Sequence, residues 1–221
     1  MNEKIDHNRT ILNAIKTHIE KTMKAVHASH GYDHVTRVVH NALHIGNAEK
    51  NANLFIIEAA AWLHDIARNL EDQNRGTLCH AKEGALMAQD FLQKLNVPNS
   101  DIKKICHCIA AHRFRSNQPP LTLEAKIIYD ADKLDSIGAT GIGRAFLFSG
   151  EIGAKLHNND ADITATEAYG EEDTAYREYM VKLCHVKEKM QTTEGKRMAI
   201  ERDAFMKEFF KRLDDEAIGR I

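Results

Sequence analysis

The chain has 221 residues, of which 43% are hydrophobic and 28% are charged, with only 3 prolines and 12 glycines. This composition predicts a folded chain, organised as a single domain over 1–221, and argues against disorder and collagen-like repeats. Because 30 basic and 32 acidic residues leave a net charge of -2, no overall positive field would attract nucleic acid or an anionic membrane.

The cysteines and the apolar runs bear on the compartment. The 4 cysteines include no CxxC pair and do not form a dense disulfide framework, which favours a reducing environment. The N-terminal residues are polar, and no apolar run approaches the roughly 20 residues that a membrane-spanning helix needs. We therefore expect a cytoplasmic protein with no membrane partner.

Apolar residues recur mostly at helical spacing, and alternating runs typical of strands are scarce, so the sequence predicts an all-α fold. Asp33 is the expected N-cap of the second helix, and Asn51 or Asn53 that of the third. The third helix is apolar nearly all the way round, which is typical of a helix in the middle of a bundle. The helices predicted in this part cover about 4–26, 33–48, 54–68, 80–95, 100–112, 123–135 and 139–148.

The composition changes after Gly150. Polar and acidic stretches predict a surface loop, and two charged helices are expected over about 174–189 and 194–215. We interpret about 151–221 as a C-terminal helical elaboration of a core over about 25–150. A separate cap or dimerisation unit is the alternative, and a homodimer stays open.

His64 and Asp65 lie near the end of the apolar third helix, where an uncompensated charge is costly. Adjacent helical residues point about 100° apart, so both side chains can meet one ion only in the wedge between them. A divalent cation there would compensate the carboxylate and engage the imidazole. The alternative is structural: an aspartate bonded to a neighbouring helix end beside a core histidine.

Two further positions favour a metal site. His34 flanks the apolar stripe of the second helix, whereas His40 and His44 fall on its polar side and are not expected to form a site. Asp132 follows an apolar run and shares a helix face with Asp135. Two such carboxylates repel unless a cation or a basic side chain lies between them, although Asp135 could also cap a helix.

These residues resemble a known family. His34, His64-Asp65 in AAAWLHDIA and Asp132 in DADKLDSIG are similar to the H…HD…D signature of the HD superfamily of metal-dependent phosphohydrolases. GYDHVTRV, HAKEGA and DADKLDSIGATGIGR resemble its stand-alone bacterial hydrolases. The resemblance covers about 25–150 and implies an HD-domain helical bundle.

The resemblance implies that His34, His64, Asp65 and Asp132 are metal ligands. Two imidazoles and two carboxylates accept Mn²⁺, Mg²⁺, Co²⁺, Ni²⁺ or Fe²⁺, and without a thiolate nothing favours a structural zinc. A cation so bound would lower the pKa of a water molecule and neutralise phosphoryl oxygens. Asp65 would thereby take part in catalysis.

His80 and His112 match positions that bind a second metal or the substrate phosphate in parts of the superfamily, with a structural role as the alternative. Basic residues near these elements are candidates for contacting phosphate. The candidates are Lys82, Arg113, Arg115 and Lys133, while Arg68 is assigned to catalysis and Glu71 and Asp72 to orienting water.

We expect hydrolysis of a small phosphorylated molecule, with nucleoside triphosphates or deoxynucleotides as first choice. A di-iron oxygenase and a nucleotide-binding module without turnover are the alternatives. Nucleic acid is disfavoured by the charge balance, and cyclic-di-GMP by the lack of a GYP-type motif. Other patterns have structural interpretations: Cys106 and Cys108 diverge on a helix, GATGIG marks close packing or a helix end, and Trp62 belongs to the core.

Overall fold

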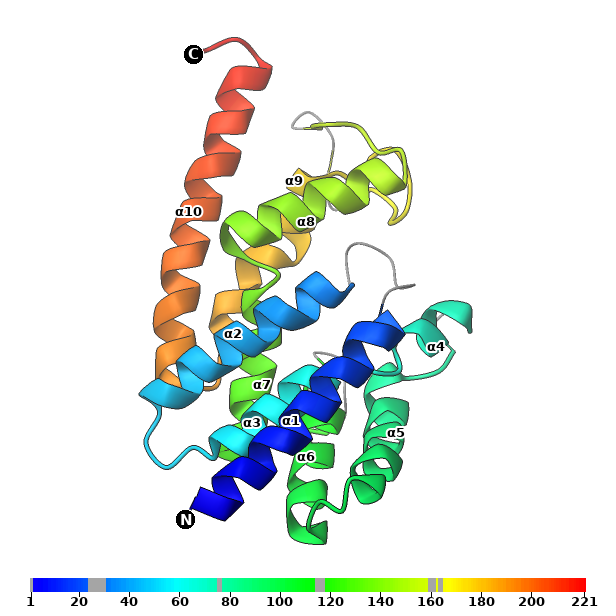
Figure 1. Ribbon diagram of the computed structural model, residues 1–221. Helices are drawn as coiled ribbons and strands as arrows, with labels where there is room; N and C mark the ends of the chain where they lie inside the picture. The colour runs from blue at the N-terminus through cyan, green and yellow to red at the C-terminus, as the bar shows by residue number, and fades with distance from the viewer. Residues whose placement is uncertain (1, 24–30, 75–76, 114–117, 159–161, 163–164) are drawn as a thin grey trace. The chain divides into compact units, whose positions relative to one another are not determined.

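The structure is a computed structural model that describes residues 2–23, 31–74, 77–113, 118–158, 162 and 165–221 (Figure 1). The described residues form helices and loops without a strand, which confirms the all-α prediction. Contacts divide the chain into two units, 1–132 and 133–221. Within the described parts, no helix combines the length and apolar character required to cross a membrane.

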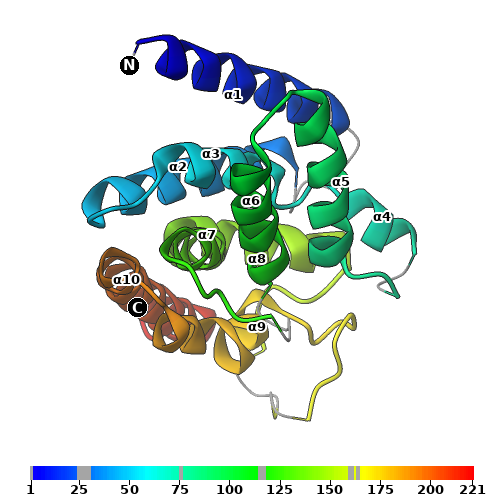
Figure 2. The same ribbon diagram turned by 90° about the horizontal axis from the view of Figure 1, so that it is seen from below.

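The first unit is built around α3 (Leu54–Leu63), which packs against α1, α2 and α6, while α5 lies along α6 (Figure 2). Positions 59–63 of α3 are all buried, as the apolar run predicts. The other helices that begin in this unit are α1 (Asn2–Thr22), α2 (Tyr32–Ala48), α4 (Arg68–Gln73), α5 (His80–Lys94), α6 (Asn99–Ala111) and α7 (Leu123–Leu134).

Two helix starts test the capping predictions. Asn53 is the N-cap of α3, and its side chain accepts from the amide of Ile56. The prediction for Asp33 is wrong: Gly31 occupies the N-cap of α2, and Asp33 lies inside the first turn. Its carboxylate instead accepts from Arg37 Nη1 at 2.6 Å, one turn along the helix.

Helix α7 is anchored in the first unit by two hydrogen bonds that precede Asp132. Asn41 Nδ2 on α2 donates to the carbonyl oxygen of Ala131 over 3.2 Å. The amide of Asn53 donates to Glu124 Oε1 over 3.1 Å. These contacts fix both ends of the segment that presents Asp132.

The second unit contains α8 (Gly138–Glu151), α9 (Ala175–Val181), the 3₁₀-helix η3 (Leu183–Lys189) and α10 (Thr193–Ala217). The single helix expected over 174–189 is therefore two elements. Tyr179 of α9 stacks on Phe210 of α10 with ring centroids 4.5 Å apart. A Cβ at Gly141 would lie 2.2 Å from the carbonyl oxygen of Ser136, so a glycine of GATGIG serves close packing, as interpreted from the sequence.

Candidate metal centre

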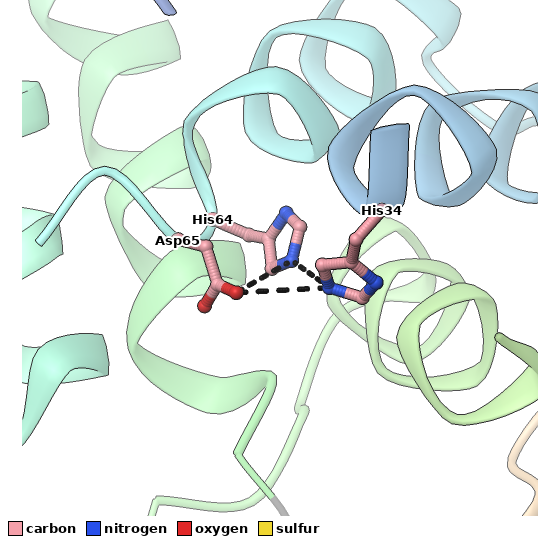
Figure 3. A group of neighbouring side chains, drawn as sticks. All are labelled: His34, His64 and Asp65. Carbon is pink, nitrogen blue, oxygen red and sulfur yellow. Dashed lines mark hydrogen bonds and ion pairs between the residues drawn. The ribbon is translucent and has the colours of Figure 1, made fainter. Parts of the chain in front are cut away.

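Three side chains of the first unit converge where α3 ends (Figure 3). His34 lies in the first turn of α2, His64 is the C-cap of α3, and Asp65 follows in the turn before α4. His34 Nε2 lies 3.3 Å from His64 Nε2, and Asp65 Oδ2 lies 3.6 Å from both nitrogens. All three residues are buried, and their atoms are close enough to bind one ion.

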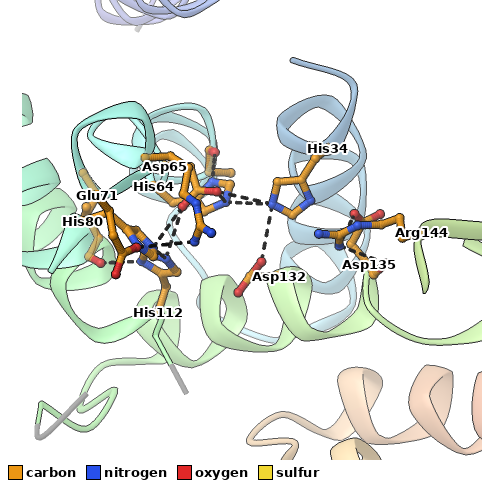
Figure 4. A network of polar contacts seen from close by, with 12 residues as sticks. His34, His64, Asp65, Glu71, His80, His112, Asp132, Asp135 and Arg144 are labelled. Atoms are coloured by element: carbon orange, nitrogen blue, oxygen red, sulfur yellow. Dashed lines mark hydrogen bonds and ion pairs between the residues drawn. The ribbon is translucent and has the colours of Figure 1, made fainter. Parts of the chain in front are cut away.

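Asp132 approaches the same group from α7 (Figure 4). Its Oδ1 lies 3.6 Å from His34 Nε2, and its side chain is 17% exposed. Asp135 lies three residues after Asp132 and was predicted to share its helix face. Its Oδ2 pairs with Arg144 Nη1 at 2.9 Å within the second unit. A basic side chain therefore accompanies the burial of Asp135.

The tautomer of His64 and the charge of Asp65 suit a cation. His64 Nδ1 donates to the carbonyl oxygen of Ala61 over 2.8 Å, so Nε2 carries the lone pair that faces His34. Burial lowers the pKa of His64 to about 4, which keeps the ring neutral. Burial acts to raise the pKa of Asp65, but His64 and the hydrogen bonds from His112 and His80 hold it well below its usual value.

Asp65 also belongs to a second group, formed with His80 and His112 (Figure 4). Asp65 Oδ1 lies 3.2 Å from His80 Nε2 and 3.6 Å from His112 Nε2. The two imidazole nitrogens are 3.2 Å apart. One carboxylate thus faces two pairs of imidazoles, one through each oxygen.

Behind His80 lies a charged cluster centred on Glu71. The carboxylate of Glu71 bonds His80 Nδ1 through Oε2 and Arg113 Nη1 through Oε1, the latter over 2.7 Å. Arg68 Nη1 lies 3.5 Å from Oε2. Burial acts to lower the pKa of His80, but Asp65 and Glu71 raise it overall. Sequence reasoning missed the pairing of Glu71 with His80, because only the tertiary fold brings α4 to the start of α5.

The other residues singled out in the sequence differ in their surroundings. The side chain of Lys82 is exposed on α5, and Lys133 belongs to the second unit. His40 and His44 are exposed, as predicted. The side chains of Asp72 and Arg115 lie outside the described residues.

The chemistry of the donors fits a divalent cation. Without an ion, two imidazole nitrogens that face each other at 3.3 Å need a shared proton to avoid lone-pair repulsion. A cation between them would satisfy both nitrogens and the adjacent carboxylates of Asp65 and Asp132. Nitrogen and oxygen donors without a thiolate suit first-row divalent metals or Mg²⁺.

Comparison with known proteins identifies the family of the chain. The HD domain family model matches residues 31–137, a range that includes all four predicted ligands. The chain belongs to the HD superfamily, and its fold is that of HD-superfamily hydrolases.

Several matches cover nearly the whole chain. YpgQ, an uncharacterized protein of Bacillus subtilis strain 168, is 33% identical over 210 residues, or 93% of each chain. The crystal structure of YpgQ in complex with ADP aligns with a TM-score of 0.73 and 29% identity, over 95% of this chain and 96% of that one. An HD-superfamily hydrolase from Bacillus thuringiensis aligns with a TM-score of 0.74 and 26% identity, over 95% and 97%.

Proposed function

We propose that the protein is a divalent-metal-dependent phosphohydrolase acting on a small phosphorylated substrate, with nucleoside triphosphates or deoxynucleotides as first choice. The observation that carries this proposal is the buried convergence of His34, His64 and Asp65, with Asp132 beside them. The preference for a nucleotide is supported by the complex of YpgQ with ADP.

In this proposal the four side chains hold one ion, which when bound would lower the pKa of a water molecule and neutralise phosphoryl oxygens. His80 and His112 lie on the other oxygen of Asp65, where they would hold phosphate oxygens. Arg113 and Arg68 would add positive charge behind them, although part of that charge is neutralised by Glu71.

A second candidate is an oxygenase with two irons. The observation that favours it is the second group, because Asp65, His80 and His112 are also close enough to bind an ion. Assays under air and under nitrogen separate the two reactions. Phosphate release that is indifferent to oxygen supports the hydrolase, whereas oxygen consumption coupled to product formation supports the oxygenase.

The proposed function is tested by a release screen. Inorganic phosphate and pyrophosphate are measured across nucleoside mono-, di- and triphosphates and their deoxy forms, with Mn²⁺, Mg²⁺, Co²⁺, Ni²⁺ or Fe²⁺. We expect metal-dependent release that Asp65→Ala abolishes and that His40→Ala, at an exposed position on the helix of His34, leaves unchanged. Nucleotide retention without release under any ion would instead identify a binding module.

A further inference from the structure

The imidazoles of the centre differ in what fixes their outer nitrogen. His64 Nδ1 lies 2.8 Å from the carbonyl oxygen of Ala61, and His112 Nδ1 lies 2.6 Å from that of Ile109. Both histidines are C-caps, where main-chain carbonyls lack a following helical amide and can accept from a side chain. With Nδ1 fixed in this way, Nε2 of each ring faces the carboxylate of Asp65.

No main-chain carbonyl of the described residues is bonded to His80 Nδ1. It is the first residue of α5, so no preceding helical turn presents an acceptor three residues earlier. Its Nδ1 bonds Oε2 of Glu71 on α4, and its Nε2 faces Asp65 Oδ1 at 3.2 Å. The carboxylate of Glu71 therefore holds Nδ1 of His80, as main-chain carbonyls hold Nδ1 of His64 and His112.

Glu71 is itself held firmly. It is 4% exposed, and its other oxygen accepts from Arg113 Nη1 over 2.7 Å. Because both oxygens are engaged behind His80, the carboxylate is directed at that ring and not at the donors around Asp65. This arrangement differs from the water-orienting role that the sequence indicates for Glu71.

We propose that Glu71 is a positioning residue of the site, keeping His80 protonated at Nδ1 and directing its Nε2 at Asp65. An ionised carboxylate accepts hydrogen bonds only, so the proton of this bond belongs to the ring nitrogen. Partners of this kind fix the orientation and tautomer of functional histidines, and their removal typically costs about 10–100-fold in activity. The kinetic part of this proposal rests on the proposed function, whereas the protonation of His80 Nδ1 does not.

The tautomer is tested by long-range ¹H–¹⁵N spectra of the imidazoles in the Mg²⁺-loaded full chain. We expect His80 to be protonated at Nδ1 in the wild type and to lose this preference in Glu71→Ala. Glu71→Gln should keep it, because the amide oxygen accepts from Nδ1–H as the carbonyls of Ala61 and Ile109 do for the other rings.

Turnover is tested on the nucleotide that the wild type hydrolyses fastest. Glu71→Ala should lower kcat about 10–100-fold with KM changed less than about threefold, and Glu71→Gln should restore kcat to within about fivefold of the wild type. Glu83→Ala removes an acidic residue from the first turn of α5 and serves as the matched control. It should leave kcat unchanged.

The outcomes distinguish this proposal from the proposed function. An unchanged His80 tautomer in Glu71→Ala overturns the positioning role, even where the wild type hydrolyses nucleotides. A loss of kcat that Glu71→Gln does not restore, with the tautomer intact, marks a purely structural role and also overturns it. If the wild type releases no phosphate, the proposed function fails and the spectra still decide the tautomer. If Glu71→Ala does not fold, the spectrum of Glu71→Gln decides the question, because loss of the Nδ1–H form there contradicts the proposal.

Discussion

Replacing Asp65 by asparagine is the sharpest perturbation of the proposed metal centre. The side-chain volume is kept, but one of the two carboxylates near His34 Nε2 is neutralised, and Asp132 remains as the other. Both oxygens of Asp65 face imidazole nitrogens within 3.6 Å, so the asparagine amide must turn its NH₂ toward one of these pairs. We expect metal affinity to fall steeply.

The size of the effect follows from burial. Removing one partner of a buried ion pair costs about 3–5 kcal/mol, which corresponds to about 10²–10⁴-fold in Kd. With metal at about 100 times the wild-type Kd, binding stabilises the folded wild type by about 2.7 kcal/mol, and the same concentration stabilises Asp65→Asn by less than about 0.5 kcal/mol. For a chain of this length, each kcal/mol shifts Tm by about 2–4 °C.

The assay is thermal unfolding of each variant with and without Mn²⁺, so that any destabilisation of the metal-free form cancels. The wild type should gain about 5–11 °C from the metal and Asp65→Asn about 2 °C or less. His40→Ala, exposed on the same helix as His34, should gain as much as the wild type. An Asp65→Asn protein that gains as much as the wild type would refute the assignment of Asp65 as a ligand.

Two other predictions concern packing and thiol chemistry. Gly141→Ala should lower the free energy of unfolding by about 1–3 kcal/mol or more, because the new Cβ would lie 2.2 Å from the Ser136 carbonyl oxygen. Gly143→Ala, with open space around it, should leave that free energy unchanged or raise it slightly. Urea titrations measure both variants, and equal midpoints would contradict this packing. Burial raises the pKa of Cys106 to about 11, so at pH 8 about 0.1% of it is thiolate. Burial also acts to raise the pKa of Cys79, but the amides of α5 and the Arg113 guanidinium hold it below its usual value. Peptide mapping after brief iodoacetamide treatment should therefore find Cys79 alkylated well before Cys106, and comparable rates would show that this order of ionisation is wrong.

Local patterns predicted the helices well where burial follows from composition. The nearly uniform apolar run of α3 indicated its central place, and Asn53 caps it as one of two expected residues. The end of α3 was not predictable, because HDIAR contains no residue that breaks a helix. The chain leaves α3 at His64 through tighter turns, with the amide of Ile66 bonding the Leu63 carbonyl and that of Arg68 bonding Asp65.

The candidate site, too, could be predicted only in part. His64 and Asp65 stood out because ionisable groups in an apolar helix are costly, and His34 because it flanks the apolar stripe of the second helix. Their roles as ligands stay predictions. The contact of Glu71 with His80 has no local signature, since it depends on how α4 packs against α5. The exposure of Lys82 had no local signature either: its side chain is exposed on α5, and its contact with phosphate stays a prediction.

The boundary between the two units falls within α7, immediately after Asp132. Severing the chain there would leave this aspartate at a fraying end, with a new α-carboxylate beside it and without the last residues of its helix. Limited proteolysis that liberates the first 132 residues should thus yield a fragment that keeps Asp132 but no longer holds it within an intact helix. The first unit is compact, but it does not contain the whole of α7. Gene truncations intended to isolate the N-terminal half therefore need to extend past Leu134.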